Sequence, residues 1–199
     1  MQENNVVTLP CVTEEGLLEG VITIGDITKS YMNLYDSSII SKACTKYANI
    51  LDTLEGSMVV GDSETYFDQG KVLIAAANPD LMENYIEKHD LVILGNRYES
   101  QLCAIEMEAG CIIVCEGAGV SLTIRKLAQE RGCAVITTPY DTYTTARLIN
   151  QSMPISYFMT REHLITFNSD DYIDEIREVM ASKRCLLYTS PSPRDRSVS

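Results

Sequence analysis

The segment Glu116-Gly117-Ala118-Gly119 combines residue types that can bind an anion. It follows the apolar run Cys111–Cys115 and precedes a helical pattern that starts after Ser121. Glycine lets backbone N–H groups approach a ligand closely, so a turn between a strand and a helix can cradle a phosphate. The lysine of a P-loop is missing, however, and no G-x-G-x-x-G spacing follows. A tight strand-to-helix turn is the favoured interpretation, and a phosphate site is the alternative.

A second polar pair, Thr23 and Asp26, stands where the apolar run Gly20–Thr23 gives way to a helical pattern. A hydroxyl and a carboxylate three residues apart at such a junction can cap the helix that follows. The same two groups could instead face a ligand. The residues by themselves leave both interpretations open.

The residues needed for metal-dependent hydrolysis are missing from the sequence. Two catalytic metal ions require clustered Asp and His ligands. The two histidines, His89 and His163, lie in unrelated segments, and Cys111 and Cys115 have no partners that would complete a metal set. We therefore expect no catalytic residue, no metal site and no cofactor in this sequence.

Composition excludes several classes of partner. The 199 residues carry a formal net charge of −12, which argues against binding to a nucleic-acid backbone. No apolar run reaches the length of about 20 residues that a membrane helix needs. Cys44, Cys103, Cys111, Cys115 and Cys133 lie in apolar segments and are interpreted as buried thiols of a reducing compartment. We expect a cytoplasmic protein without nucleic-acid or membrane partners.

The central sequence alternates short apolar runs with helical patterns, which is typical of a parallel sheet covered on both faces. Strands are predicted at Ser57–Val60, Val72–Ala76, Leu91–Leu94, Cys111–Cys115 and Ala134–Thr137. Helices are predicted at Ser37–Leu54, Pro79–Lys88, Ser100–Glu108, Ser121–Arg131 and Thr142–Asn150. Beyond Met153, a strand at Leu164–Phe167 and a helix striped by Ile173, Ile176 and Val179 are predicted.

The opening segment resembles the end of a cystathionine-β-synthase-type (CBS) module. The similarity lies in "LPCVTEEGLLEGVITIGDIT", with Thr23 and Asp26 at the family's motif positions. This resemblance implies that the Thr23 hydroxyl meets a phosphate and that Asp26 accepts from ribose hydroxyls. The segment 154–184 resembles the first half of a second CBS module, and Thr160 would then border the same nucleotide cleft.

The central segment resembles the DRTGG domain, named for a split motif. Its first part corresponds to Gly95-Asn96-Arg97 and its glycine part to the turn that holds Gly117 and Gly119. Asn96 replaces the usual Asp, and Ala118 interrupts the paired glycines. The residue types by themselves allow Arg97 to pair with Glu99, with Glu106 or with a carboxylate across a dimer, or to be solvated.

The order of parts resembles the regulatory insert of CBS-containing manganese-dependent inorganic pyrophosphatases. The expected domains are a CBS half-module at 1–32, a connecting helix at 33–46, a DRTGG-like α/β domain at 47–152, a second CBS half-module at 153–184 and a non-native or disordered tail at 185–199. The expected fold is α/β, with a mostly parallel central sheet between two incomplete half-modules. We expect the two half-modules to complement each other or to expose the apolar stripe of the last helix.

The resemblance implies a sensor that binds AMP, ADP or ATP as a homodimer, and diadenosine polyphosphates are the further ligands associated with members that have the DRTGG domain. It would control pyrophosphate hydrolysis by manganese-loaded catalytic domains elsewhere in a longer chain. A CBS and DRTGG sensor attached to a transcription regulator or a transferase is one alternative. The other is a dimerisation scaffold without a ligand.

Overall fold

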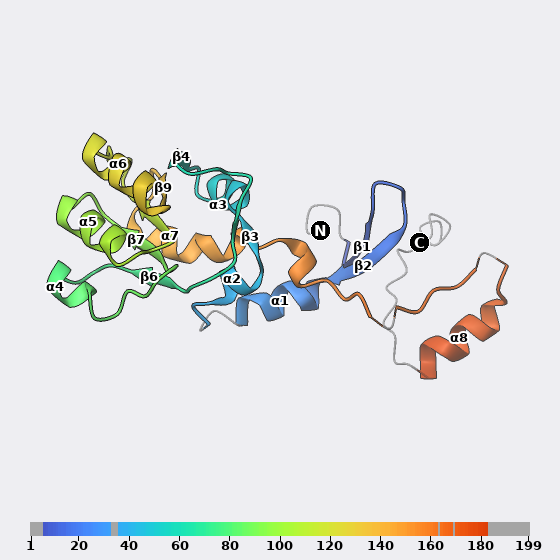
Figure 1. The fold of residues 1–199 in the computed structure, drawn as a ribbon. Helices are drawn as coiled ribbons and strands as arrows, with labels where there is room; N and C mark the ends of the chain where they lie inside the picture. The colour runs from blue at the N-terminus through green and yellow to red at the C-terminus, as the bar shows by residue number, and fades with distance from the viewer. Residues whose placement is uncertain (1–5, 33–35, 163, 169, 183–199) are drawn as a thin grey trace, which may run out of the picture. The chain divides into compact units, whose positions relative to one another are not determined.

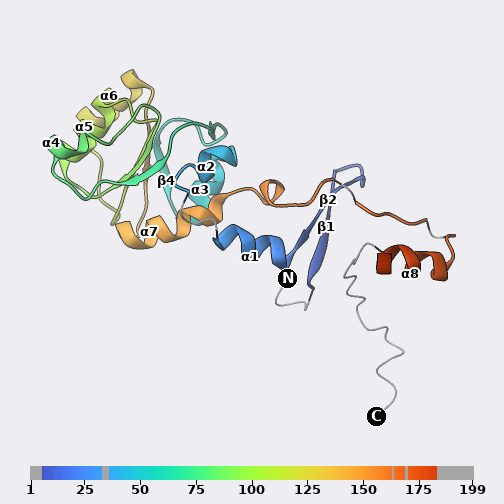
Figure 2. The same cartoon turned by 90° about the horizontal axis from the view of Figure 1, so that it is seen from below.

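The computed structural model describes residues 6–32, 36–162, 164–168 and 170–182. The chain divides into two compact units, one made of Met1–Tyr31 with Phe158–Ser199 and one of Met32–Tyr157. Figure 1 follows the chain from blue to red, and Figure 2 shows it from below. His163, the tail at 185–199 and residues 33–35 of the predicted connecting helix lie outside the described residues.

A five-stranded sheet forms the centre of the second unit. Its strands, in the order β4-β9-β8-β7-β6, are β4 (Ser57–Val60), β9 (Ala134–Thr137), β8 (Cys111–Val114), β7 (Leu91–Leu94) and β6 (Val72–Ile74). Strands β6 to β9 are parallel, and β4 pairs with β9 in the antiparallel sense. The prediction of a mostly parallel α/β sheet is confirmed, with one antiparallel edge.

Helices cover both faces of this sheet. One face carries Val92, Leu94, Ile112, Val114 and Val135, and it packs against α4 (Pro79–Met82), α5 (Tyr98–Glu106) and α6 (Leu122–Arg131). The other face packs against α2 (Ile39–Lys42), α3 (Tyr47–Thr53), α7 (Thr142–Leu148) and the 3-10 turn η1 (Ile149–Ser152). Figure 2 shows α4, α5 and α6 together on one side of the unit. Alternate residues of each strand therefore belong to separate cores, which explains why the central strands are apolar throughout.

Local capping fixes the ends of two helices, as the sequence predicts. The Ser121 side chain accepts a hydrogen bond from the Ile124 N–H at 3.3 Å, and Gly132 ends α6 with a φ of 68°. That left-handed conformation suits glycine. Asp141 caps α7 by accepting from the Thr144 N–H at 2.9 Å.

The helix predicted over Ser37–Leu54, and with it the connecting helix at 33–46, is wrong for the described residues. The chain instead forms α2, a turn and the short strand β3 (Thr45–Lys46) before α3. Cys44 takes a φ of 51° and is exposed, against the prediction of a buried thiol. β3 pairs with β5 (Tyr66–Phe67), so a tertiary strand pairing overrides the helical periodicity.

Two further predicted elements are shorter in the structure. The helix predicted to reach Lys88 ends at Met82. The Asn84 and Tyr85 N–H groups bond only three residues back, to the Leu81 and Met82 carbonyls, and the Glu87 N–H bonds to the Asp90 carboxylate. Strand β6 ends at Ile74, and the chain turns before Pro79.

The first unit joins the N-terminal hairpin to residues from the far end of the sequence. Strands β1 (Thr8–Val12) and β2 (Leu18–Thr23) pair antiparallel, and β2 runs into α1 (Ile24–Met32), as Figure 1 shows in blue. Thr160 forms a β-bridge with Val21. The two half-modules therefore complement each other at this point.

The C-terminal part of this unit departs from the prediction. Leu164–Phe167 is not a strand, because its backbone finds no ladder partner among the described residues. Helix α8 (Ile173–Ser182) forms as predicted, but none of its residues is buried, and Ile173 is 69% exposed. The apolar stripe is thus largely exposed.

Candidate functional site

Thr23 and Asp26 form a reciprocal cap at the junction of β2 and α1. The Asp26 Oδ2 atom accepts from the Thr23 N–H at 2.9 Å and from the Thr23 hydroxyl at 2.7 Å. The Asp26 N–H in turn donates to Thr23 Oγ1 at 3.2 Å. This is the capping-box arrangement, so the capping interpretation of these two residues holds.

The cap leaves part of the polar surface available. Among the described residues, no hydrogen bond is made to Asp26 Oδ1, so this oxygen can accept from a ligand hydroxyl. The Thr23 hydroxyl hydrogen, by contrast, is donated to Asp26. A phosphate oxygen is an acceptor only, so a phosphate could take that hydrogen only by displacing Asp26.

Thr160 is brought beside the same strand from the other end of the sequence. Its N–H donates to the Val21 carbonyl and its carbonyl accepts from the Val21 N–H, both at 2.9 Å. The buried Met159 packs against Gly20, where an added Cβ would lie 2.9 Å from the Met159 sulfur and from the Thr160 oxygen. The structure therefore brings Thr160 within two residues of Thr23 along β2.

The two motif loops of the central unit lie side by side at the carboxyl edge of the sheet. Gly95-Asn96-Arg97 follows β7, and the turn containing Gly117 and Gly119 follows β8, its parallel neighbour. Carboxyl edges of parallel sheets are common ligand sites. The two parts of the split motif, which are separated in the sequence, thus lie on one surface of the fold.

Backbone hydrogen bonds within the unit occupy the glycine turn. The Glu116 N–H donates to the Tyr140 carbonyl and the Gly117 N–H to the Thr138 carbonyl, each at 2.8 Å. Both residues have left-handed φ values, 65° and 62°. These N–H groups are not free to cradle a phosphate, so the tight-turn interpretation is the one that the geometry supports.

Asn96 and Arg97 are exposed on this edge. Within the described part of the chain, no carboxylate forms an ion pair with Arg97. Of the alternatives for this residue, the pairs with Glu99 and Glu106 do not form and the solvated arginine agrees with the structure, while a carboxylate across a dimer stays a prediction. The neighbouring Tyr140–Thr145 segment mainly serves the fold, through the Asp141 cap of α7 and through the Tyr140 hydroxyl, which donates to Glu55 at 2.8 Å.

Buried cysteines pack the core of the central unit. Burial raises the pKa of the Cys103, Cys111, Cys115 and Cys133 thiols, that of Cys133 to about 12. These groups therefore stay protonated and act as small apolar side chains. No group of three His, Cys, Asp or Glu side chains suited to a metal occurs in the described ranges. No helix there is long and apolar enough to cross a membrane.

Sequence reasoning missed one important polar residue, Asp90, which is 1% exposed. Its carboxylate accepts from the Lys71 N–H at 2.9 Å and from the Glu87 N–H at 2.8 Å. An acidic residue directly before an apolar strand was the available signal.

The fold defines a three-layer α/β domain with its polar motif loops at one sheet edge, and comparison with known proteins gives its family. Residues 49–152 match the model of the DRTGG domain. The chain belongs to the DRTGG-domain family.

Relatives match almost the whole chain. It is 34% identical to a cobalt-dependent inorganic pyrophosphatase of Clostridium perfringens and 25% identical to a probable manganese-dependent inorganic pyrophosphatase of Thermotoga maritima, over 92% of its length in each case. It spans only about a third of the length of these relatives.

A solved structure matches this chain with the same sequence identity and coverage as the first of these relatives. It contains the CBS and DRTGG domains of the regulatory region of Clostridium perfringens pyrophosphatase, complexed with the activator diadenosine tetraphosphate. The match has a TM-score of 0.85 and 34% identity, and it covers 92% of this chain and 80% of that one. The present chain is thus similar to a regulatory region in sequence and in fold.

Proposed function

We propose that this chain is the adenine-nucleotide-sensing regulatory region of an inorganic pyrophosphatase. The observation that carries the proposal is the structural match to a pyrophosphatase regulatory region complexed with diadenosine tetraphosphate. The sequence similarity to two pyrophosphatases over 92% of this chain supports the same function.

The nucleotide is proposed to bind where β2 meets α1, with Thr23, Asp26 and Thr160 at its border. Asp26 Oδ1 is the acceptor for the ribose hydroxyls, since Oδ2 is engaged by Thr23. Binding of phosphate by the Thr23 hydroxyl requires its hydrogen to turn from Asp26 to the ligand. Regulation follows if one arrangement of the modules binds the nucleotide more tightly than another.

Titration calorimetry of the 199-residue chain with diadenosine tetraphosphate and with AMP tests this site. Asp26→Ala should weaken binding about tenfold or more, because the ribose acceptor is lost. Asp26→Asn keeps an acceptor for the Thr23 N–H, and with it the cap, but turns an NH2 donor towards the ribose, so it should weaken binding without disturbing the fold. The control is Thr28→Val, because within the described part of the chain the Thr28 hydroxyl bonds only to the Ile24 carbonyl of the same helix. Unchanged affinity in a folded Asp26→Ala variant would reject the assignment.

The catalytic reaction is proposed to take place in other domains of a longer chain, where manganese would serve pyrophosphate hydrolysis. Extending the chain with its native flanking sequence and measuring hydrolysis with and without AMP tests this part. Absence of hydrolysis in a folded, manganese-loaded protein would contradict it.

A homodimer that binds no nucleic acid is the proposed assembly. The exposed Arg97 and the acidic net charge are the features that motivate these two proposals. Sedimentation of the chain over a range of concentrations tests the first, and a mobility-shift assay with duplex DNA and RNA tests the second. A monomer at all concentrations, or retarded nucleic acid, would contradict the respective proposal.

A further inference from the structure

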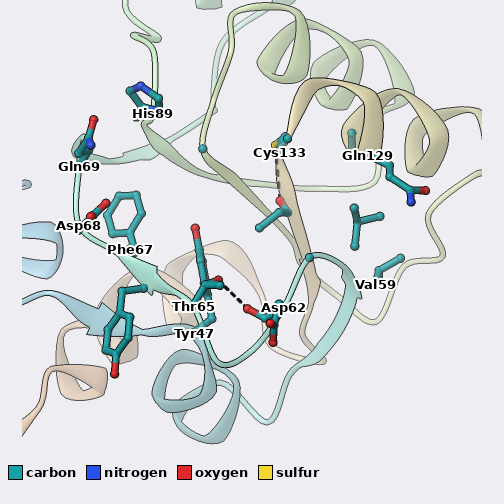
Figure 3. A pocket seen from close by; sticks show the side chains of 17 residues that line it. Tyr47, Val59, Asp62, Thr65, Phe67, Asp68, Gln69, His89, Gln129 and Cys133 are labelled. Atoms are coloured by element: carbon teal, nitrogen blue, oxygen red, sulfur yellow. Dashed lines mark hydrogen bonds between the residues drawn. The ribbon is translucent and has the colours of Figure 1, made fainter.

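A cavity of about 740 Å³ opens in the central unit at the edge of the sheet opposite the motif loops. His89, Gly110 and Cys133 line it, and each of these residues lies one or two positions before a strand, β7, β8 and β9 respectively. Further walls are formed by the residues that directly follow β4 and by the segment that contains β5 (Figure 3). Its volume is in the range of small-molecule sites.

Buried aromatic side chains form part of the wall. Phe67 is 3% exposed and Tyr47 is 7% exposed. In Figure 3 the Tyr47 hydroxyl points into the cavity. Burial, with a smaller contribution from the nearby Cys111, Cys133 and Asp68, raises the pKa of Tyr47 well above its ordinary value. Phe67 and Tyr47 expose little of their rings, so the aromatic surface that the cavity offers to a ligand is mainly that of Tyr66, which also lines it and is 54% exposed.

The wall of the cavity carries two carboxylates. Asp62 and Asp68 are the carboxylates, and none of the lining residues is Lys or Arg. In Figure 3 the two carboxylates lie on opposite sides of Tyr47. Asp62 lies near the Lys46 ammonium, which pairs with Glu64 at 2.6 Å. The lining residues themselves include carboxylates but no Lys or Arg, so the wall favours a cation over a phosphate or another anion.

The kind of cation is limited by the same residues. Asp62, Asp68 and His89 do not converge into a set that could hold a metal ion within the described part of the chain. The cavity is far larger than a hydrated ion needs, and the aromatic wall suits carbon chains and the faces of ammonium groups. A ligand with separated positive charges joined by methylene groups matches both features.

We propose that this cavity binds a linear polyamine, with ammonium groups at Asp62 and Asp68 and its carbon chain against the exposed ring of Tyr66. The site lies at the opposite edge of the sheet from the motif loops and shares no residue with the proposed nucleotide site. Its existence is therefore independent of the proposed function.

Titration calorimetry of the whole chain with spermidine at physiological salt tests the site. We expect saturable binding of one spermidine per chain. Asp62→Asn and Asp68→Asn should each weaken binding about fivefold through loss of one charge contact. Gln129→Lys should also weaken binding, because this exposed residue lines the cavity and the added ammonium group would repel the ligand.

Two controls separate a built site from general attraction to an acidic protein. Asp80→Asn removes one exposed carboxylate outside the cavity and should leave the affinity unchanged. Asp26→Asn should do the same, whatever its effect on nucleotide binding. The proposal fails if spermidine gives no saturable heat, if Asp80→Asn weakens binding as much as Asp68→Asn, or if a folded Gln129→Lys variant binds like the parent chain.

Discussion

Asp90 connects three segments of the central unit through backbone hydrogen bonds. Its carboxylate takes the N–H groups of Lys71 and Glu87, and its carbonyl takes the N–H groups of Gly110 and Cys111. The amino ends of β6, β7 and β8 are thereby held together. A buried carboxylate is costly unless its oxygens are satisfied, and here both are.

Replacing Asp90 by Ala should lower the free energy of unfolding by about 2–4 kcal/mol, because two N–H groups lose a charged acceptor. Urea denaturation followed by circular dichroism measures this. Glu87→Ala is the matched control, since its side chain forms only an exposed ion pair with Lys71 and a change within about 0.5 kcal/mol is expected. Equal effects of the two substitutions would contradict the role given to Asp90.

Asp36 provides a pH-dependent contact at the residue scale. Hydrogen bonds from Lys42 and Ser38 lower the pKa of its carboxyl from 3.8 to about 2. Because the folded pKa lies below the ordinary one, the contact stabilises the fold above pH 3.8, and this contribution is lost as the pH falls towards 2.

NMR titration of the Asp36 carboxyl checks this value. Lys42→Ala should raise the pKa of Asp36 towards 3.8, whereas Lys46→Ala, which removes the partner of Glu64, should leave it unchanged. An Asp36 pKa near 3.8 in the parent chain would rule out the contact in solution.

At the scale of elements, Gly20 permits the close approach of the Met159–Thr160 segment to β2. A Cβ at this position would lie 2.9 Å from both the Met159 sulfur and the Thr160 carbonyl oxygen. Gly20→Val should therefore displace the segment and break the bridge between Val21 and Thr160.

Hydrogen exchange of the Val21 and Thr160 amides measures the loss of this bridge. In Gly20→Val, both amides should be markedly less protected than in the parent chain. Gly25→Ala is the control, because only the Thr23 hydroxyl lies near its Cβ position, at 3.4 Å. Unprotected Val21 and Thr160 amides in the parent chain would instead exclude the bridge itself.

At the scale of the whole molecule, the two units differ in how their cores are built. Both large buried clusters belong to Met32–Tyr157, which contains the entire five-stranded sheet. The other unit joins two distant segments and has few buried apolar side chains among its described residues. Stability should therefore be distributed unevenly along the chain.

The fragment 32–157 should consequently unfold in one cooperative transition, with a urea midpoint close to that of the main transition of the full chain. The fragment 1–31 alone should show no protected amides, because it lacks the 159–160 segment. A fragment 32–157 that fails to fold would show that its core depends on the other unit.

Sequence by itself determined the elements whose local signals agree. The all-apolar strands at Leu91–Leu94 and Cys111–Val114, the Ser121 and Asp141 caps and the Gly132 helix end were all predictable, because each depends on neighbours within a few residues. The Thr23–Asp26 pair was predictable for the same reason, although its spacing left capping and ligand binding equally open.

Tertiary structure decided everything that depends on residues far apart in the sequence. The pairing of β3 with β5 broke the periodic helix predicted over Ser37–Leu54, and no local signal encodes that partner. The placement of Thr160 beside Val21, and of Asp68 and Cys133 around one cavity, likewise follows from chain topology. Periodicity reports which face of a segment is apolar, but only the folded chain selects what covers that face.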